Sequence, residues 1–80
     1  MIIGVDCAPG PHDEAVPRRL HFGSRPIDVV EILDRWPGAD HLYVKLRGSD
    51  GALYILRHDT ARGVWELTLY DAGGGTREQT

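Results

Sequence analysis

Three stretches between residues 42 and 70 alternate apolar and polar side chains, and two short polar segments separate them. A period of two residues is typical of a strand with one buried face. The pattern predicts antiparallel strands at 42–48, 52–58 and 64–70. Asp50-Gly51 favours a two-residue type I′ turn, in which both central residues have positive φ. Asp59–Gly63 is expected to form a five-residue loop.

These two connections determine which side chains share a face, because opposed residues of an antiparallel pair point the same way. The predicted buried face contains Leu42, Val44, Leu46, Leu53, Ile55, Trp65, Leu67 and Leu69. The predicted exposed face contains Tyr43, Lys45, Arg47, Tyr54, Leu56, His58, Glu66, Thr68 and Tyr70. Arg57 is a charged exception on the buried face, where its aliphatic stem is expected to lie along Trp65. A one-residue slip of the second hairpin would turn Glu66 and Thr68 into the apolar layer, which supports this register.

The stretch 27–36 fits both a helix and a strand. Four apolar residues fall on one helical stripe, and Asp28 and Glu31 are placed to cap a helix start. Four β-branched residues within six positions favour a strand, and the adjacent Ile32 and Leu33 indicate a bulge. We expect a strand at 27–34 and a short strand at 20–22. The predicted fold is therefore all-β, a small antiparallel meander curled into an SH3-like partial barrel, with α+β as the alternative.

Both ends of the chain are rich in residues that favour turns or disorder. Residues 1–17 contain Pro9, Gly10, Pro11 and Pro17, which predicts a flexible arm in which Met1–Asp6 could still add a short edge strand. Residues 72–80 contain three consecutive glycines and no large apolar side chain, which predicts a flexible tail. A single small β domain is expected over residues 18–71.

Length and charge narrow the classes of partner. An 80-residue chain with 41% hydrophobic residues can form one small core. A formal net charge of −3 argues against non-specific binding to nucleic acid or to an anionic membrane, because both require basic residues. No apolar run approaches the roughly 20 residues of a membrane-spanning helix, and the first residues are not typical of a signal peptide. The one cysteine, Cys7, excludes an intrachain disulfide and favours the cytoplasm.

The sequence does not bring together a recognisable catalytic or metal-binding set. His41 and His58 are expected at the same end of the sheet as Asp59, but the histidines lack the helical spacing of common zinc ligands and there is no C-x-x-C pair. Cys7 has no neighbouring base of the kind that a reactive nucleophile requires. We therefore predict a non-enzymatic protein without a cofactor.

The predicted exposed face is the best candidate for a binding surface. Its aromatic and basic members are Tyr43, Lys45, Arg47, Tyr54, His58 and Tyr70. Such a face can contact a protein, or it can stack bases and hold phosphates. The acidic total charge favours an unidentified protein partner, with single-stranded nucleic acid as the alternative. An exposed edge strand could also pair with a second copy of the chain.

Four sequence motifs resemble a known group of proteins. They are V-x-E-I-L-D-R-W at 29–36, L-Y-V-K-L at 42–46, G-A-L-Y-I-L-R-H-D at 51–59 and V-W-E-L-T-L-Y-D at 64–71. Their order resembles short bacterial proteins grouped as a domain of unknown function, with the strand pattern V-x-x-V-L-D-x-W, Y-x-V, G-x-Y-x-L and W-x-L. The matching positions, within a little over half of the chain, are Val29, Ile32, Leu33, Asp34, Trp36, Tyr43, Val44, Tyr54, Leu56, Trp65, Leu67 and Tyr70. The linker after Trp36 is shorter here. Because actinobacterial relatives are often encoded beside error-prone DNA polymerase components, the resemblance implies a DNA-damage context, and it transfers no catalytic residue.

Overall fold

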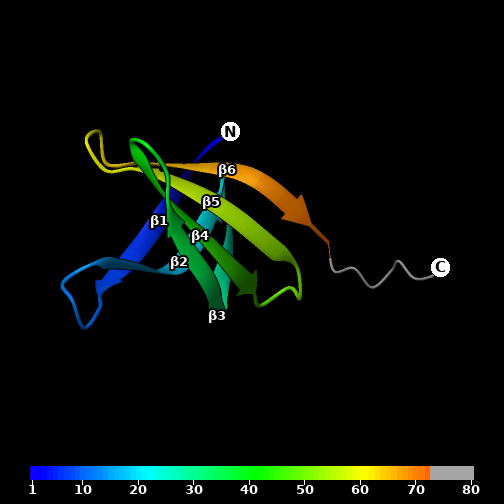
Figure 1. Ribbon diagram of the computed structural model, residues 1–80. Coiled ribbons are helices and arrows are strands. Elements are labelled where there is room, and N and C mark those ends of the chain that lie inside the picture. Colours follow the sequence, from blue (N-terminus) through cyan, green and yellow to red (C-terminus); the bar gives the residue numbers. More distant parts are fainter. Residues whose placement is uncertain (73–80) are drawn as a thin grey trace.

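Six antiparallel strands close into a small barrel in the computed structural model, which describes residues 1–72 (Figure 1). The strands are β1 (Ile2–Pro9), β2 (Ala15–Phe22), β3 (Arg25–Pro37), β4 (His41–Gly48), β5 (Leu53–Asp59) and β6 (Val64–Asp71). The predicted all-β class is confirmed, and the closed barrel is consistent with the expected SH3-like size class. The described residues include no helix that is long and apolar enough to cross a membrane. The predicted flexible tail falls, from residue 73 onward, outside the described residues.

β3 pairs with two neighbouring strands, β2 and β4, along different parts of its length. Its first four residues pair with β2, and the stretch from Val29 to Pro37 pairs with β4. Register shifts between Val29 and Glu31 and between Ile32 and Asp34 interrupt the ladder with β4 and bend the strand there. The predicted strand and its bulge near Ile32 are therefore confirmed, and the helical alternative is wrong.

The N-terminal residues belong to the barrel, in contrast to the flexible arm that we predicted for residues 1–17. β1 pairs with β2 from Gly4 to Pro9, and with β6 through Ile2 and Ile3. The prolines do not interrupt these ladders, because Pro9 ends β1 and Pro17 lies beside an irregularity in the β1–β2 register. The first strand thus closes the barrel instead of forming an edge (Figure 1).

The turn between β4 and β5 contains three residues, and the predicted two-residue type I′ turn is wrong. The Gly51 N–H donates to the Gly48 carbonyl (3.0 Å), and the Gly48 N–H donates to the Ala52 carbonyl (2.9 Å). Gly51, with φ 84°, is the only turn residue with positive φ, whereas a type I′ turn needs two. Leu46 therefore lies opposite Tyr54, one residue away from the predicted pairing.

The loop between β5 and β6 also differs from the prediction by one residue. It is one residue shorter than predicted, whereas the β4–β5 turn is one residue longer. Asp59 pairs with Val64 and His58 with Trp65, so four residues form the loop instead of five. Because the two shifts cancel, Trp65 points into the barrel as predicted, whereas the side chains of β5 lie on the opposite face from the prediction. Tyr54 and Leu56 are buried, and the side chains predicted there, Leu53 and Ile55, lie on the outside.

A bulge near the end of β6 changes the direction of its last side chains. Leu56 pairs with Leu67, but Ile55 pairs with Leu69, so Thr68 is an extra residue. Leu69 is consequently 54% exposed, although the alternation predicted it to be buried. The bulge also places Tyr70 opposite Tyr54, on the inner side of the sheet.

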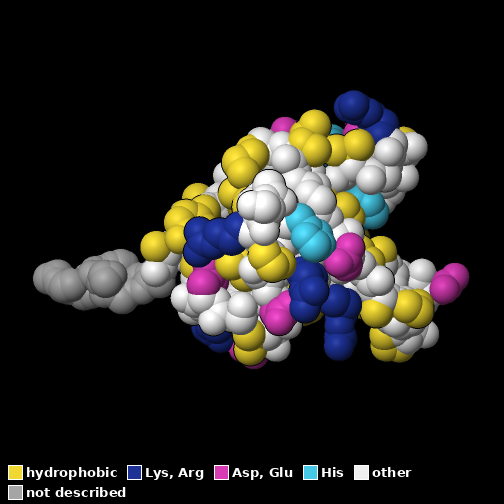
Figure 2. All heavy atoms as spheres, turned by 180° about the vertical axis from the view of Figure 1, so that it is seen from behind, with side chains coloured by type: hydrophobic (Ala, Val, Ile, Leu, Met, Phe, Trp, Pro, Cys, Tyr) yellow, Lys and Arg dark blue, Asp and Glu magenta, His cyan; other side chains and the backbone are white. Residues whose placement is uncertain are grey.

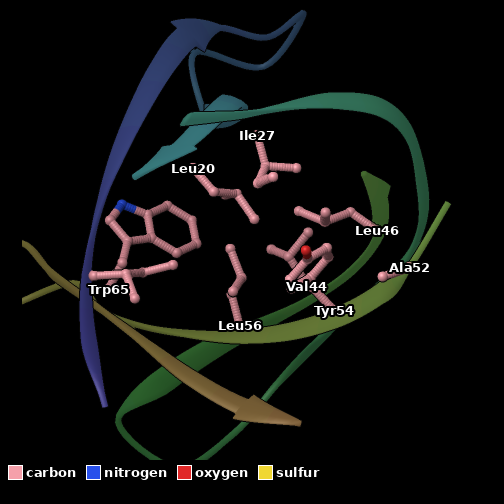
Figure 3. Close-up of a cluster of buried hydrophobic side chains, with 9 residues drawn as sticks. Leu20, Ile27, Val44, Leu46, Ala52, Tyr54, Leu56 and Trp65 are labelled. Carbon is pink, nitrogen blue, oxygen red and sulfur yellow. The ribbon is translucent and has the colours of Figure 1, made fainter. Parts of the chain in front are cut away.

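The core is a single cluster contributed by all six strands and the β4–β5 turn. Its buried members are Ile3, Leu20, Ile27, Val44, Leu46, Ala52, Tyr54, Leu56 and Trp65. Figure 3 shows Leu20 and Leu56 near the middle of the cluster, Trp65 toward one end and Ala52 toward the other. The Trp65 indole and the Tyr54 phenol therefore lie toward opposite ends of the core.

Gly48 provides space for this core where the turn leaves the barrel. An alanine Cβ at this position would lie 2.8 Å from Ile27 Cγ2 and 2.9 Å from Tyr54 Cε1. We expect Gly48→Ala to lower the free energy of unfolding by about 1–3 kcal/mol, because buried rings and branched chains cannot move aside without strain. Urea denaturation measures this change.

Gly4→Ala is the matched control. Its Cβ would meet its nearest neighbour, His21 Cβ, at an ordinary 3.4 Å. It should change the free energy of unfolding by no more than about 0.5 kcal/mol. Equal effects of the two substitutions would contradict the close packing around Gly48.

Candidate functional site

The outward side of β3–β6, here called the outer face, arranges its side chains in three rows across the sheet. The register gives these rows as Trp36, Tyr43, Arg57 and Glu66; Asp34, Lys45, Ile55 and Leu69; and Glu31, Arg47, Leu53 and Asp71. Neighbouring side chains in a row lie close enough to contact one another. The outer face is therefore a continuous mixed surface that is built from four strands.

Apolar side chains run across the outer face from β3 to β6. Ile55 lies directly opposite Leu69, and Leu53 follows on the same side of β5. In the next row, the rings of Trp36 and Tyr43 stack with centroids 5.5 Å apart and an angle of 8°. These residues form a partly exposed strip of aliphatic and aromatic surface, which is uncommon on the exposed side of a small barrel.

Charged side chains lie on both sides of this strip in pairs of opposite sign. Arg47 Nη1 donates to Glu31 Oε1 at 2.8 Å, and Arg57 Nε donates to Glu66 Oε1 at 3.0 Å. The hydrogen bond from Arg57 is the main reason why the pKa of Glu66 is lowered, so this carboxylate stays ionised at neutral pH. Lys45 lies opposite Asp34. The rim of the outer face is therefore charged but locally balanced.

The six residues of the predicted binding face do not share one surface. Tyr43, Lys45 and Arg47 lie on the outer face, as expected. Tyr54, His58 and Tyr70 are on the inner side, because the reversed β5 and the β6 bulge turn them toward the barrel. Tyr54 retains only 3% of its surface exposed.

A pocket of about 330 Å³ opens at one end of the barrel, and we call it the mouth pocket. Its lining residues are Met1, Phe22, Arg25, Ile27, Asp50, Tyr54, Leu67 and Tyr70. The centroids of the Phe22 and Tyr54 rings lie 5.7 Å apart with an angle of 26° between the rings, and the Tyr70 centroid lies 5.2 Å from that of Tyr54 at an angle of 51°. Three strands thus place three aromatic rings around one concavity.

Asp50 fixes the central ring of the mouth pocket. Its Oδ2 accepts a hydrogen bond from the Tyr54 hydroxyl at 2.5 Å, and its Oδ1 accepts one from the Ala52 N–H at 3.1 Å. Burial alone would raise the pKa of Asp50, but these hydrogen bonds and the charge of Arg25 hold it below its ordinary value. Burial and the Asp50 carboxylate raise the pKa of Tyr54, which keeps its phenol protonated. The carboxylate is thus ionised beside a neutral ring.

Sequence reasoning missed Phe22, Arg25 and Asp50 as functional candidates. It assigned Asp50 to a turn and Phe22 to the end of a short strand, and both assignments are correct locally. The spacing of Asp50 and Tyr54, with a glycine turn between them, was a usable signal. A side-chain oxygen of a turn aspartate is well placed to accept hydrogen bonds from groups that follow it.

A stacked pair of rings lies at the other end of β5. The His58 ring lies parallel to Trp65, with centroids 4.0 Å apart and an angle of 1°. His58 therefore occupies the position predicted for the stem of Arg57, which instead lies on the outer face. Burial lowers the pKa of His58, and the nearby Asp59 offsets part of this effect. His58 is thus mainly neutral at neutral pH.

The remaining candidates from the sequence do not form a reactive centre within residues 1–72. No group of three histidine, cysteine or carboxylate side chains in this range could hold a metal ion. Cys7 is exposed as a residue, but its thiol is partly buried. This burial and the charge of Asp6 raise the pKa of the thiol. A raised pKa disfavours the reactive thiolate.

Comparisons with protein-family models, with curated proteins and with solved structures gave no match.

The His58–Trp65 stack should make stability depend on pH. Because the folded state lowers the pKa of His58, the unfolded state binds this proton more readily, and stability must fall as the pH drops through the ordinary value of 6.5. Between about pH 7.5 and about pH 5, the wild type should lose more unfolding free energy than His58→Phe, which keeps a stacked ring without a titrating group.

Denaturation curves at a series of pH values measure this difference. His12→Phe, at an exposed position in the β1–β2 turn, is the control for the change from histidine to phenylalanine. Identical slopes for the wild type and His58→Phe would contradict the assigned role of His58.

Proposed function

We propose that this protein is a non-enzymatic interaction module that binds a protein partner through its outer face. The observation that carries the proposal is the partly exposed aliphatic strip of Leu53, Ile55 and Leu69 beside the Trp36–Tyr43 stack. We place the protein in the bacterial cytoplasm, on its single cysteine and on its resemblance to short bacterial proteins.

The strip has no evident role in holding the barrel together. The barrel is closed by six strands around its own core, and Leu69 is 54% exposed on the opposite side of the sheet from that core. An apolar centre with a polar rim is the usual anatomy of a protein interface, in which aromatic and large aliphatic residues contribute most of the affinity. The partner is therefore expected to cover Leu69 and Ile55.

The balanced rim favours a protein over a polyanion. Glu31 accepts a hydrogen bond from Arg47, and Glu66 accepts one from Arg57. Figure 2 shows the same intermixing on one face of the whole molecule, where Lys and Arg side chains lie among Asp, Glu and hydrophobic side chains. A nucleic acid needs unpaired positive charge to replace its counterions.

Single-stranded nucleic acid remains the second candidate, and one feature favours it. Tyr43, Lys45 and Arg47 follow one another on the outward side of β4, so that an aromatic ring lies in line with two cations. Such a strip can stack a base and contact phosphates. The DNA-damage context that the family resemblance implies also belongs to this candidate.

Site-specific photocrosslinking tests the proposed interface. A photoreactive amino acid placed at Leu69 should crosslink to a protein in extract of the source organism, because this position is the most exposed aliphatic member of the apolar strip. Val30 is the matched control, since it is a comparably exposed apolar residue (63% against 54%) in the bulged part of β3. The readout is the set of crosslinked proteins identified by mass spectrometry after nuclease treatment.

The same protein should be crosslinked from position 69 and not from position 30, and Ile55→Asp should abolish the crosslink. Crosslinks of equal yield at both positions, or crosslinks that Ile55→Asp does not change, would contradict the proposed interface.

The nucleic-acid candidate has its own test. Fluorescence anisotropy with a labelled single-stranded oligonucleotide should show no binding at physiological salt, because Arg47 is engaged by Glu31. Tight binding that weakens steeply with salt and is lost in Arg47→Ala would instead favour the second candidate over the first.

A further inference from the structure

The mouth pocket is a concave site that the proposed protein interface does not use. Its aromatic walls come from β2, β5 and β6, and they lie on the inner side of the sheet whose other side forms the outer face. Ring stacking fixes Phe22 against Tyr54, and Tyr70 is tilted over the same ring. Aromatic faces carry partial negative charge and attract cations that lie against them.

Asp50 adds a full negative charge to this aromatic site. Each of its carboxylate oxygens accepts one hydrogen bond, from Tyr54 and from Ala52, and each can still face a further positive group. These contacts hold the carboxylate in place, so a ligand does not have to order it. The rings and the carboxylate together form a site that favours a positively charged group of moderate size.

We propose that the mouth pocket binds a methylated ammonium group, in which the cation is surrounded by apolar methyl groups. Phe22 and Tyr70 would contact the methyl groups, Tyr54 would hold these two rings in place, and Asp50 would balance the charge. The volume of about 330 Å³ is at the small end of the range for ligand pockets, which suits a compact group. Ile27 and Leu67 complete an apolar lining that disfavours a strongly hydrated ammonium.

Arg25 is the group in the mouth pocket that opposes a cation. It lines the pocket, and its charge contributes to the lowered pKa of Asp50. None of the ion pairs found within residues 1–72 joins Arg25 to Asp50, and Arg25 is exposed beside the β2–β3 turn. Arg25 therefore acts at a distance as a competitor, and its removal should strengthen the binding of a cation.

Titration with choline chloride, followed by NMR, tests the proposal on the full chain. The N-methyl protons of bound choline should shift upfield, because they lie against aromatic rings, and the amide signals of residues around the pocket should change. The uncharged analogue 3,3-dimethylbutan-1-ol has the same shape and should bind markedly more weakly. A trimethyllysine peptide, compared with choline, distinguishes a protein side chain from a free small cation as the source of the group, and binding of either supports the site.

Four variants assign the binding to this pocket. Tyr70→Ala and Asp50→Asn should each weaken choline binding by about 3- to 30-fold, and Arg25→Ala should strengthen it. Tyr70 is 53% exposed, so its truncation should leave the fold intact, as the amide spectrum will show. Tyr43→Ala removes a tyrosine from the outer face and should leave choline binding unchanged, which separates this site from the proposed protein interface.

Three results would overturn the proposal. They are equal binding of choline and its uncharged analogue, the absence of any upfield shift at saturating choline, and equal effects of Tyr70→Ala and Tyr43→Ala. None of these results bears on the photocrosslinking at Leu69, so the two proposals can fail independently.

Discussion

The number of residues in the turn after β4 determines which side chains this barrel buries. A two-residue turn would have placed Leu53 and Ile55 in the core, whereas the three-residue turn places Tyr54 and Leu56 there. β5 is apolar on both sides, so hydrophobic burial alone discriminates weakly between the two registers. The left-handed conformation of Gly51 fits the three-residue turn, and Asp50 then reaches both Ala52 and Tyr54.

Both candidate sites follow from this one turn. Reversing β5 brings a phenol ring to the mouth of the barrel, where it meets Asp50, Phe22 and Tyr70. The same reversal sends Leu53 and Ile55 to the outer face, where the β6 bulge adds Leu69. An ordinary structural feature, the length of a hairpin loop, thus distributes the aromatic and aliphatic residues between two separate surfaces.

The alternation of β4 was enough to predict its two faces, because Val44 and Leu46 are flanked by Tyr43, Lys45 and Arg47. The strand character of β3 could be predicted for a similar reason, since β-branched residues dominate its first half. The faces of β5 could not be predicted in the same way, because neither side of this strand is polar at its centre. Trp65 was placed correctly only because the two errors in loop length cancelled.

Local sequence patterns also did not reveal that β1 pairs with β6 and closes the barrel. The prolines of the first 17 residues indicate turns, but they carry no information about a ladder between Ile3 and Trp65, which are more than sixty positions apart. The mouth pocket was missed for the same reason, since Phe22, Asp50 and Tyr70 come from distant parts of the sequence. Which distant residues come together depends on how all six strands pair with one another.

The ladder that closes the barrel is also its shortest. β1 and β6 share two residue pairs, Ile2 with Glu66 and Ile3 with Trp65, and the Leu67 N–H donates to the Met1 carbonyl at 2.7 Å. A seam with so few hydrogen bonds opens at a lower free energy than the longer ladders around it. Met1 and Leu67 both border the mouth pocket, so transient parting of this seam would widen the pocket entrance while the remaining ladders stay paired. The shortest ladder of the barrel therefore lies beside the pocket entrance.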